Sequence, residues 1–293
     1  MKKKILILGI NGMLGSMVFD YFLNNKIYEV YGTTRKEFDV ENNNYDIIEE
    51  IYPDYIINCI GMIKPYIDEN NIDSIKRAID INSIFPLKLK DTTDKNIKVI
   101  QIATDCVYNG KIDIMESYNE YSIKNAEDIY GKSKLLGEIK SDNFIILRCS
   151  ILGPELEKRE KSSLFNWVIN QPKNSEINGF DNHLWNGITT LQFAKICEEI
   201  TSSDVYLNSK IQHIVPKDSI TKYKLLNLIC EIFNRKDIKI NKVQAKDLIN
   251  RRLSTIRDSM NNILWNNNIL SVKEMLIELK IYLTNKLEKL NGK

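Results

Sequence analysis

The sequence predicts an α/β protein built on a doubly wound parallel sheet, with a smaller region in its C-terminal half. Two observations lead to this prediction. Through the first half of the chain, short and continuously apolar runs alternate with amphipathic helical stretches, which is the pattern of strands covered by helices on both faces. A turn with glycines at three-residue intervals follows directly on the first apolar run.

Each element of the first half follows from the local pattern. Residues 5–8 form an apolar run between lysines and a glycine, which predicts a strand. Over residues 12–24, apolar side chains recur at intervals of three and four and predict a helix with one apolar face. The same arguments predict strands at 29–34, 55–59, 99–103 and 144–148, and helices at 72–89 and 130–140.

The second half is less regular. Helical patterns cover 190–200, 221–233 and 272–290, and polar, Asn-rich loops are expected between Pro172 and Gly187. With 293 residues the chain is long enough for about two domains. We expect these at 1–150 and 151–293, with part of the second packing back on the sheet of the first.

Composition excludes several classes of protein. The 41 basic and 39 acidic side chains give a net charge of +2, so nothing favours nucleic acid as a partner. The five cysteines include no C-x-x-C pair and only two histidines are present, which argues against a disulfide framework and a metal site. The N-terminal apolar run is too short for a signal peptide or a membrane span. We therefore expect a cytoplasmic protein without membrane contact.

The glycine turn has the residues of a phosphate-binding loop. Glycines at 9, 12 and 15 suit a tight turn, close approach of the backbone to a pyrophosphate and close helix packing, at a helix N-terminus that favours anions. The spacing is G-x-x-G-x-x-G, and a purely structural turn is the alternative. We expect the 1–150 domain to bind a dinucleotide through Gly9, Asn11, Gly12, Met13, Leu14 and Gly15.

The residues after the second predicted strand bear on which dinucleotide binds. A carboxylate there accepts the ribose hydroxyls of NAD, whereas a cation favours the additional phosphate of NADP. Arg35 occupies this place and predicts NADP(H), unless it is only a solvated surface residue. Glu37 and Asp39 follow closely, so NAD(H) remains an alternative.

A tyrosine and a lysine four residues apart form the candidate catalytic pair. Tyr130 and Lys134 would project from the same face of the predicted helix. A nearby ammonium group stabilises a phenolate and lowers the pKa of the phenol towards neutral pH. Y-x-x-x-K is common by chance, but here it accompanies the glycine loop and Thr104, at the end of a predicted strand.

Taken together, these motifs resemble the extended short-chain dehydrogenase/reductase superfamily, and most closely its dTDP-4-dehydrorhamnose reductase family. The resemblance extends over nearly the whole chain and is weakest over residues 155–186. The segments that carry it are the glycine loop, Ala103-Thr104-Asp105-Cys106-Val107-Tyr108-Asn109-Gly110, Tyr130-Gly131-Lys132-Ser133-Lys134-Leu135-Leu136-Gly137-Glu138, Asn58-Cys59-Ile60-Gly61, Ile81-Asn82 and Arg252-Leu253-Ser254.

The resemblance implies a Rossmann fold and hydride transfer from NADPH to carbon 4 of a nucleotide-linked 4-keto-6-deoxysugar, in the synthesis of polysaccharide precursors. It implies that Tyr130 protonates the developing alkoxide, that Lys134 holds the nicotinamide ribose and that Thr104 binds the carbonyl oxygen. The remaining implied roles are cofactor binding by Asn58, Gly61 and Asn82, with capping as the alternative for the two asparagines. The candidate substrate-binding residues are Asp105 and, in a predicted loop of the 151–293 region, Trp185.

Three departures from the family pattern leave the exact sugar undecided. Ala103 replaces the usual serine, Asn109 replaces a frequent aspartate, and a proline is missing from residues 125–128. Dehydratases of the superfamily have a glutamate at the position of Cys106, so dehydration is not expected.

Two other functions stay open. Cys106 and His183 could shuttle protons in a combined epimerase and reductase resembling GDP-fucose synthase; the alternatives are a small apolar residue and a polar loop residue. The family also resembles the NADP-binding regulatory subunit of methionine adenosyltransferase, although Thr104, Tyr130 and Lys134 together favour an enzyme. The expected partners are a nucleotide-sugar substrate and, as an alternative to a monomer, a second copy in a homodimer.

A few further side chains could contact the substrate. Trp185 and Trp167 could stack on a base or sugar, and Trp167 could instead pack in the core. Arg148, Lys158 and Arg159 could hold the diphosphate of the substrate, or lie at the surface in contact with water.

Overall fold

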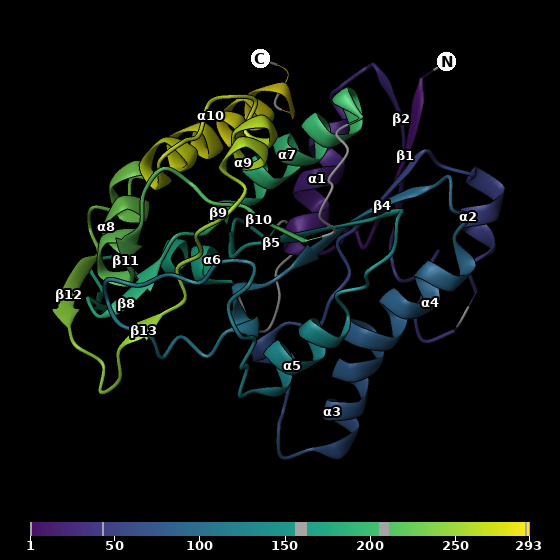
Figure 1. Cartoon of the computed structure of the whole chain (residues 1–293). Helices are drawn as coiled ribbons and strands as arrows, with labels where there is room; N and C mark the ends of the chain where they lie inside the picture. The colour runs from purple at the N-terminus through teal and green to yellow at the C-terminus, as the bar shows by residue number, and fades with distance from the viewer. Residues whose placement is uncertain (1, 43, 156–162, 205–210, 291, 293) are drawn as a thin grey trace.

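A six-stranded parallel sheet forms the centre of the molecule (Figure 1). The computed structural model describes residues 2–42, 44–155, 163–204, 211–290 and 292. The strand order is β10-β5-β4-β3-β1-β2, and all neighbouring strands run parallel. The strands are β1 (Lys3–Leu8), β2 (Tyr28–Thr33), β3 (Tyr55–Asn58), β4 (Lys98–Ala103), β5 (Phe144–Arg148) and β10 (Ile211–His213). The predicted fold class is confirmed.

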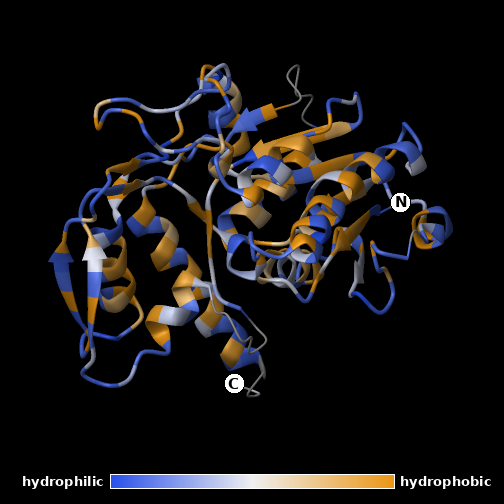
Figure 2. Ribbon diagram, turned by 90° about the horizontal axis from the view of Figure 1, so that it is seen from below, coloured by the Kyte–Doolittle hydropathy of each residue, from blue (hydrophilic) through white to orange (hydrophobic). Residues whose placement is uncertain are grey.

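Helices cover both faces of this sheet, which explains why its strands are apolar throughout. In β1, Ile5 and Ile7 belong to the core shared with α1 (Met13–Leu23) and α7 (Thr190–Ser203). Leu6 and Leu8 point to the opposite face and pack with α2 (Asp46–Ile51) and α4 (Phe85–Thr92). All four side chains are fully buried, and hydrophobic colouring dominates the strands of the central sheet in Figure 2. Burial on both faces is the physical cause of the continuous apolar runs.

The helix predicted over 72–89 is interrupted. The structure has α3 (Ile72–Ile79), a turn of π-helix η2 (Asp80–Ile84) and then α4, which has Pro86 in its first turn. Proline lacks an N–H donor and its ring excludes the preceding carbonyl, so a new helical register begins there. The predicted helix 130–140 is α5 (Ile129–Leu136), and it ends where Gly137 comes close to the carbonyl oxygen of Asn82 in η2.

The prediction of loops between Pro172 and Gly187 is wrong, because two strands lie there. β7 (Glu176–Phe180) pairs in parallel with β12 (Lys239–Val243), about 60 residues further along the chain. β8 (His183–Trp185) lies between β11 (Ile220–Thr221) and β13 (Ile249–Asn250). Each strand buries only one or two side chains, so no apolar run marks it, and its partners are remote in sequence.

The remaining elements join the two halves. β10 and α7 come from the second half of the chain but complete the sheet and cover one of its faces. One apolar core continues from α1 and α7 to the helices of the second half. A domain boundary at residue 150 stays a prediction. The other elements are η1 (Lys64–Tyr66), η3 (Asp105–Val107), the strand pair β6 (Ile151–Leu152) and β9 (Ile188–Thr189), and the helices α6 (Leu164–Ile169), α8 (Lys222–Ile232), α9 (Asp258–Leu264) and α10 (Val272–Leu290).

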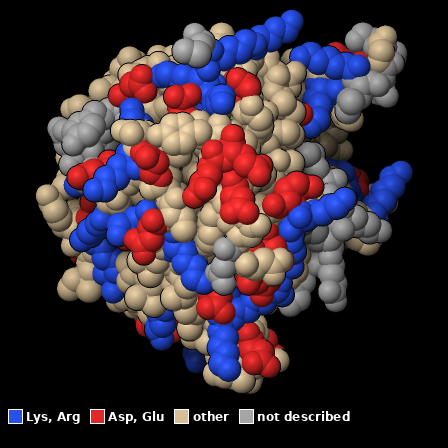
Figure 3. Space-filling model, turned by 90° about the vertical axis from the view of Figure 1, so that its right-hand side faces the viewer, with Lys and Arg blue, Asp and Glu red and all other residues tan. Residues whose placement is uncertain are grey.

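The surface carries charges of both signs. On the face shown in Figure 3, Lys and Arg side chains alternate with Asp and Glu side chains. This mixture agrees with the small net charge of the sequence. Among the helices of the described residues, none has the length and apolar character needed to cross a bilayer.

Candidate active site

A cavity of about 560 Å³ opens at the carboxyl ends of the central strands, where ligands bind in open α/β sheets. Its walls come from the glycine loop, the ends of β3, β4 and β5, and helices α3 and α5. The predicted site residues that line it are Gly12, Met13, Leu14, Arg35, Gly61, Thr104, Asp105, Tyr130 and Lys134. Residues separated by more than 120 positions in sequence therefore share one surface.

The glycine loop has the backbone shape that the spacing predicted. Gly9 has a φ of +83°, a conformation that favours glycine. A Cβ on Gly15 would lie 2.2 Å from the carbonyl oxygen of Gly9, so this position also requires glycine. These two glycines shape the turn, and Asn11 is exposed at its outer side. Gly12 caps α1 without a side-chain hydrogen bond, so the first N–H groups of α1, beside the cavity, are suited to bind an anion.

Tyr130, Lys134 and Thr104 converge on one side of the cavity. Tyr130 and Lys134 lie on α5, and Thr104 follows β4, where its hydroxyl group is a hydrogen-bonding neighbour of the Tyr130 phenol. The Lys134 Nζ donates to the carbonyl oxygen of Ile102, 3.0 Å away. The close approach depends on Gly131, since a Cβ there would lie 2.2 Å from the carbonyl oxygen of Cys106.

Burial controls the protonation states at this site. It raises the pKa of the Tyr130 phenol, and the neighbouring Cys106 thiol adds to the effect. The direction is opposite to the one expected from Lys134, whose own pKa is lowered to about 8, also by burial. Desolvation of the phenolate is therefore the largest influence on the phenol. The stable form of Tyr130 is the neutral phenol, which is the form that can donate a proton.

Asn58 and Asn82 lie behind the cavity wall. The Asn58 Oδ1 accepts from the N–H of Ile60 at 3.0 Å. The Asn82 amide accepts from the N–H of Met62 and donates to its carbonyl oxygen, both at 2.9 Å, and also donates to Ser133 Oγ. Asn82 therefore fixes the loop after β3 against α5. Both asparagines are almost fully buried, and each hydrogen-bonds backbone next to Gly61, which lines the cavity.

The predicted substrate residues occupy different places. Asp105 lines the cavity, accepts a hydrogen bond from Thr104 Oγ1 at 3.2 Å, and has its pKa raised by burial. Trp185 is buried and donates to Ser150 Oγ at 2.8 Å, so its indole packs beneath the site. Cys106 lines the cavity, and burial raises the pKa of its thiol to about 12. His183 lies on β8 outside the described cavity wall, where its ring contacts Phe180.

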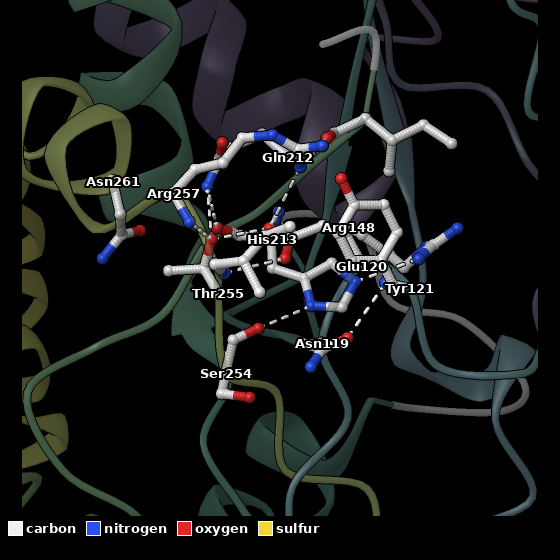
Figure 4. A network of polar contacts seen from close by, with 12 residues as sticks. Asn119, Glu120, Tyr121, Arg148, Gln212, His213, Ser254, Thr255, Arg257 and Asn261 are labelled. Atoms are coloured by element: carbon white, nitrogen blue, oxygen red, sulfur yellow. Dashed lines mark hydrogen bonds and ion pairs between the residues drawn. The ribbon is translucent and has the colours of Figure 1, made fainter.

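The hypothesis of Arg148 as a diphosphate clamp is wrong. Its side chain is fully buried and forms a two-point ion pair with Glu138, at 2.8 and 2.5 Å. Its remaining nitrogen contacts the hydroxyl group of Tyr108 and Nε2 of His213, both at 2.9 Å. Figure 4 shows Arg148 and His213 within a polar network that reaches Glu120, Ser254, Thr255 and Arg257. Lys158 and Arg159 lie outside the described residues, and Trp167 is partly exposed on α6.

Two basic residues near the cavity were not found from the sequence. Arg77, in the last turn of α3, lines the cavity at the same end as Arg35. Lys222, at the start of α8, lies 5.5 Å from the ring of Trp185, and its charge acts on Asp105 and Cys106. Neither belongs to a motif, and each comes from a helix whose docking against the site is a tertiary feature.

The chain matches a known protein family and has relatives among characterised proteins. The family model described as the RmlD substrate binding domain matches residues 2–263. The beta subunit of methionine adenosyltransferase 2 from Bos taurus is 25% identical over 250 residues, covering 79% of this chain and 72% of that protein. The corresponding subunit from Danio rerio is 26% identical over 250 residues, covering 79% and 74%.

Solved structures agree with this assignment at the level of the fold. A dTDP-4-dehydrorhamnose reductase from Bacillus anthracis, solved with NADP, has a TM-score of 0.78 at 21% identity and covers 96% of this chain and 100% of that chain. The homologous enzyme from Clostridium acetobutylicum has a TM-score of 0.75 at 22% identity, covering 96% and 99%. Because the family model extends over most of the chain and this fold is shared, the chain belongs to the RmlD substrate binding domain family.

Proposed function

We propose that this protein is an NADPH-dependent reductase that acts on the 4-keto group of a nucleotide-linked 4-keto-6-deoxysugar. The observation that carries the proposal is the convergence of Thr104, Tyr130 and Lys134 in the cavity that the glycine loop also lines. The two similar reductase structures are dTDP-4-dehydrorhamnose reductases, and one of them contains NADP. Family membership supports the same class of chemistry.

The residues of the cavity fit a nicotinamide dinucleotide. The first N–H groups of α1, together with the backbone of Gly12, Met13 and Leu14, would hold the pyrophosphate. Gly61 lines the same cavity and lies next to Lys134, whose Nζ is 3.8 Å from the place that a Cβ on Gly61 would take. Lys134 would then bind the ribose next to the nicotinamide. The bound cofactor supplies the hydride.

Tyr130 would supply the proton in this reaction. As hydride adds to the carbonyl carbon, negative charge develops on the carbonyl oxygen, and the neutral phenol of Tyr130 can neutralise it. The hydroxyl group of Thr104 would stabilise the same oxygen by a hydrogen bond. Burial keeps the phenol protonated before the reaction. An ammonium group on Lys134, one helical turn away on α5, would help to stabilise the phenolate afterwards.

One alternative has direct support from sequence comparison. The curated relatives are beta subunits of methionine adenosyltransferase 2, so a regulatory binding function without turnover is the second candidate. The presence of Thr104, Tyr130 and Lys134 in one cavity favours the enzyme. A combined epimerase and reductase is less supported, because Cys106 lines the cavity whereas His183 lies outside its described wall.

The test is NADPH oxidation with a panel of 4-keto-6-deoxysugar nucleotides in heavy water, followed by mass analysis of the product. Turnover without deuterium at carbons 3 and 5 supports the reductase, and deuterium there supports the epimerase. Tyr130→Phe and Lys134→Ala should abolish turnover, whereas the matched control Lys132→Ala, an exposed lysine of the same helix, should not. Tight dinucleotide binding without any turnover would favour the regulatory function instead.

A further inference from the structure

Two arginines from separate elements meet at one end of the cavity. Arg35 lies after β2, and Arg77 lies in the last turn of α3; both line the cavity. Both also contact the same carboxylate. A terminal nitrogen of Arg77 lies 3.3 Å from Glu41 Oε2, and a terminal nitrogen of Arg35 lies 3.8 Å from it. This end adjoins the exit of β2, where the adenosine ribose lies in dinucleotide-binding sheets.

The hydrogen-bonding capacity of Arg77 is only partly used. Its Nε is buried and has no hydrogen-bond partner among the described residues, although Arg77 already contacts Glu41 through a terminal nitrogen. The Nε edge of a guanidinium group, together with one terminal nitrogen, binds phosphate oxygens in a two-point arrangement. An unpartnered buried donor beside a cavity is best satisfied by a ligand acceptor.

Among the described carboxylates of the loop after β2, Glu41 is the one that contacts these two arginines. Glu37 accepts hydrogen bonds from the backbone N–H and the hydroxyl group of Thr34, which lower its pKa and keep it turned into its own loop. Asp39 accepts from the N–H of Glu41 at 3.0 Å. Glu41 is therefore the carboxylate in contact with both arginines, and two guanidinium groups against one carboxylate leave a net positive charge.

We propose that Arg77 and Arg35 form a clamp for the phosphate on the adenosine ribose of NADP(H), and that Glu41 is the internal anion that this phosphate displaces. The proposal rests on the dinucleotide binding of the proposed function, and it adds Arg77 and Glu41 to Arg35 as residues that select the cofactor. In NAD(H) the same ribose carries a hydroxyl group, which can donate a hydrogen bond to Glu41. Glu41 then stays in place between Arg77 and Arg35 and continues to balance their charge. Arg77 thereby favours binding of NADP(H), and Glu41 favours binding of NAD(H).

The test is calorimetric titration of the full-length protein with NADP⁺ and with NAD⁺. Arg77→Gln should weaken NADP⁺ binding about tenfold or more, the usual effect of losing a charge-assisted hydrogen bond, and change NAD⁺ binding less than about twofold. Glu41→Gln should strengthen NADP⁺ binding and weaken NAD⁺ binding. Lys76→Gln, which removes an exposed cation from the adjacent position of α3, should leave both affinities unchanged.

Unchanged NAD⁺ binding in Arg77→Gln also shows that this variant is folded. Equal loss of affinity for both dinucleotides, or no loss for either, would overturn the clamp while leaving dinucleotide binding intact. Equal affinity of the unmodified protein for NADP⁺ and NAD⁺ would overturn it too. Binding of neither dinucleotide would overturn the proposed function, and this inference with it.

Discussion

Replacing Arg148 by methionine should lower the free energy of unfolding by about 3–5 kcal/mol, the usual cost of breaking a buried ion pair by removing one partner. The Arg148 side chain is fully buried, and 4% of the Glu138 side chain is exposed. Without the guanidinium group, Glu138 keeps a carboxylate that neither water nor another described cation at hydrogen-bonding distance can stabilise. Tyr108 and His213 also each lose a hydrogen-bonding neighbour.

A double-mutant cycle separates the ion pair from the loss of packing. Glu138→Gln removes the charge but keeps the shape, so Arg148→Met with Glu138→Gln should be less destabilised than the sum of the two single variants by about 2 kcal/mol. The assay is urea denaturation at neutral pH followed by circular dichroism. Lys111 and Glu127 provide the exposed control: their ion pair is also short, at 2.8 Å, but both side chains are 60% exposed. Lys111→Met should cost less than about 1 kcal/mol.

Two results would refute this reasoning. One is a loss below about 1 kcal/mol in Arg148→Met, which would show that water or rearrangement stabilises Glu138. The other is additivity of the two single variants. Where Arg148→Met remains folded, its affinity for NADP⁺ should equal that of the unmodified protein, because Arg148 does not reach the cavity surface.

Three further predictions concern titration and packing. Burial lowers the pKa of His213 to about 4, against 6.5 for a free histidine. Between these pH values the histidine is neutral in the folded protein and charged in the unfolded one, so unfolding should take up a proton. The free energy of unfolding should therefore fall by about 3 kcal/mol as the pH drops from 6.5 to 4. Denaturation across this range should show the slope in the unmodified protein and in His183→Gln, and its persistence in His213→Gln would contradict the assignment. Because Lys134 has a pKa lowered to about 8, kcat/KM for NADPH should decrease above that pH in the unmodified protein and in Lys132→Ala; a flat profile would argue against a charged Lys134 in cofactor binding. Gly131→Ala should cost about 1–3 kcal/mol of stability and reduce turnover, since the new methyl group would overlap the carbonyl oxygen of Cys106; wild-type values in both assays would show that α5 can shift without consequence.

Much of the candidate site could be predicted because its signals are local. The glycine loop must be a short segment between a strand and a helix, so its spacing is visible in seven consecutive residues. Tyr130 and Lys134 share a face of α5 because four residues make about one helical turn. Thr104 directly follows an apolar strand. These patterns place each group at the carboxyl edge of a parallel sheet, where side chains from different strands meet.

The pairing of short strands in the second half could not be predicted in this way. β8 depends on β11 and β13 for its hydrogen bonds, and neither partner has more than two residues. β10 has three residues and belongs to the central sheet although it comes from the second half. Such strands carry too few side chains to show a period, and their stability comes from partners remote in sequence.

By itself the sequence determined the alternation of strands and helices, the glycine turn and the spacing of the tyrosine and lysine, because hydrophobic burial and helical geometry impose periods on neighbouring residues. The tertiary structure alone decided which charges are buried and which face the cavity. Arg148 and Arg77 have the same side chain. Arg148 forms an ion pair with Glu138 inside the protein, whereas Arg77 lies beside Arg35 at the cavity. The difference is physical: the state of a charged side chain depends on the dielectric and the partners around it, and these are supplied by segments far away along the chain.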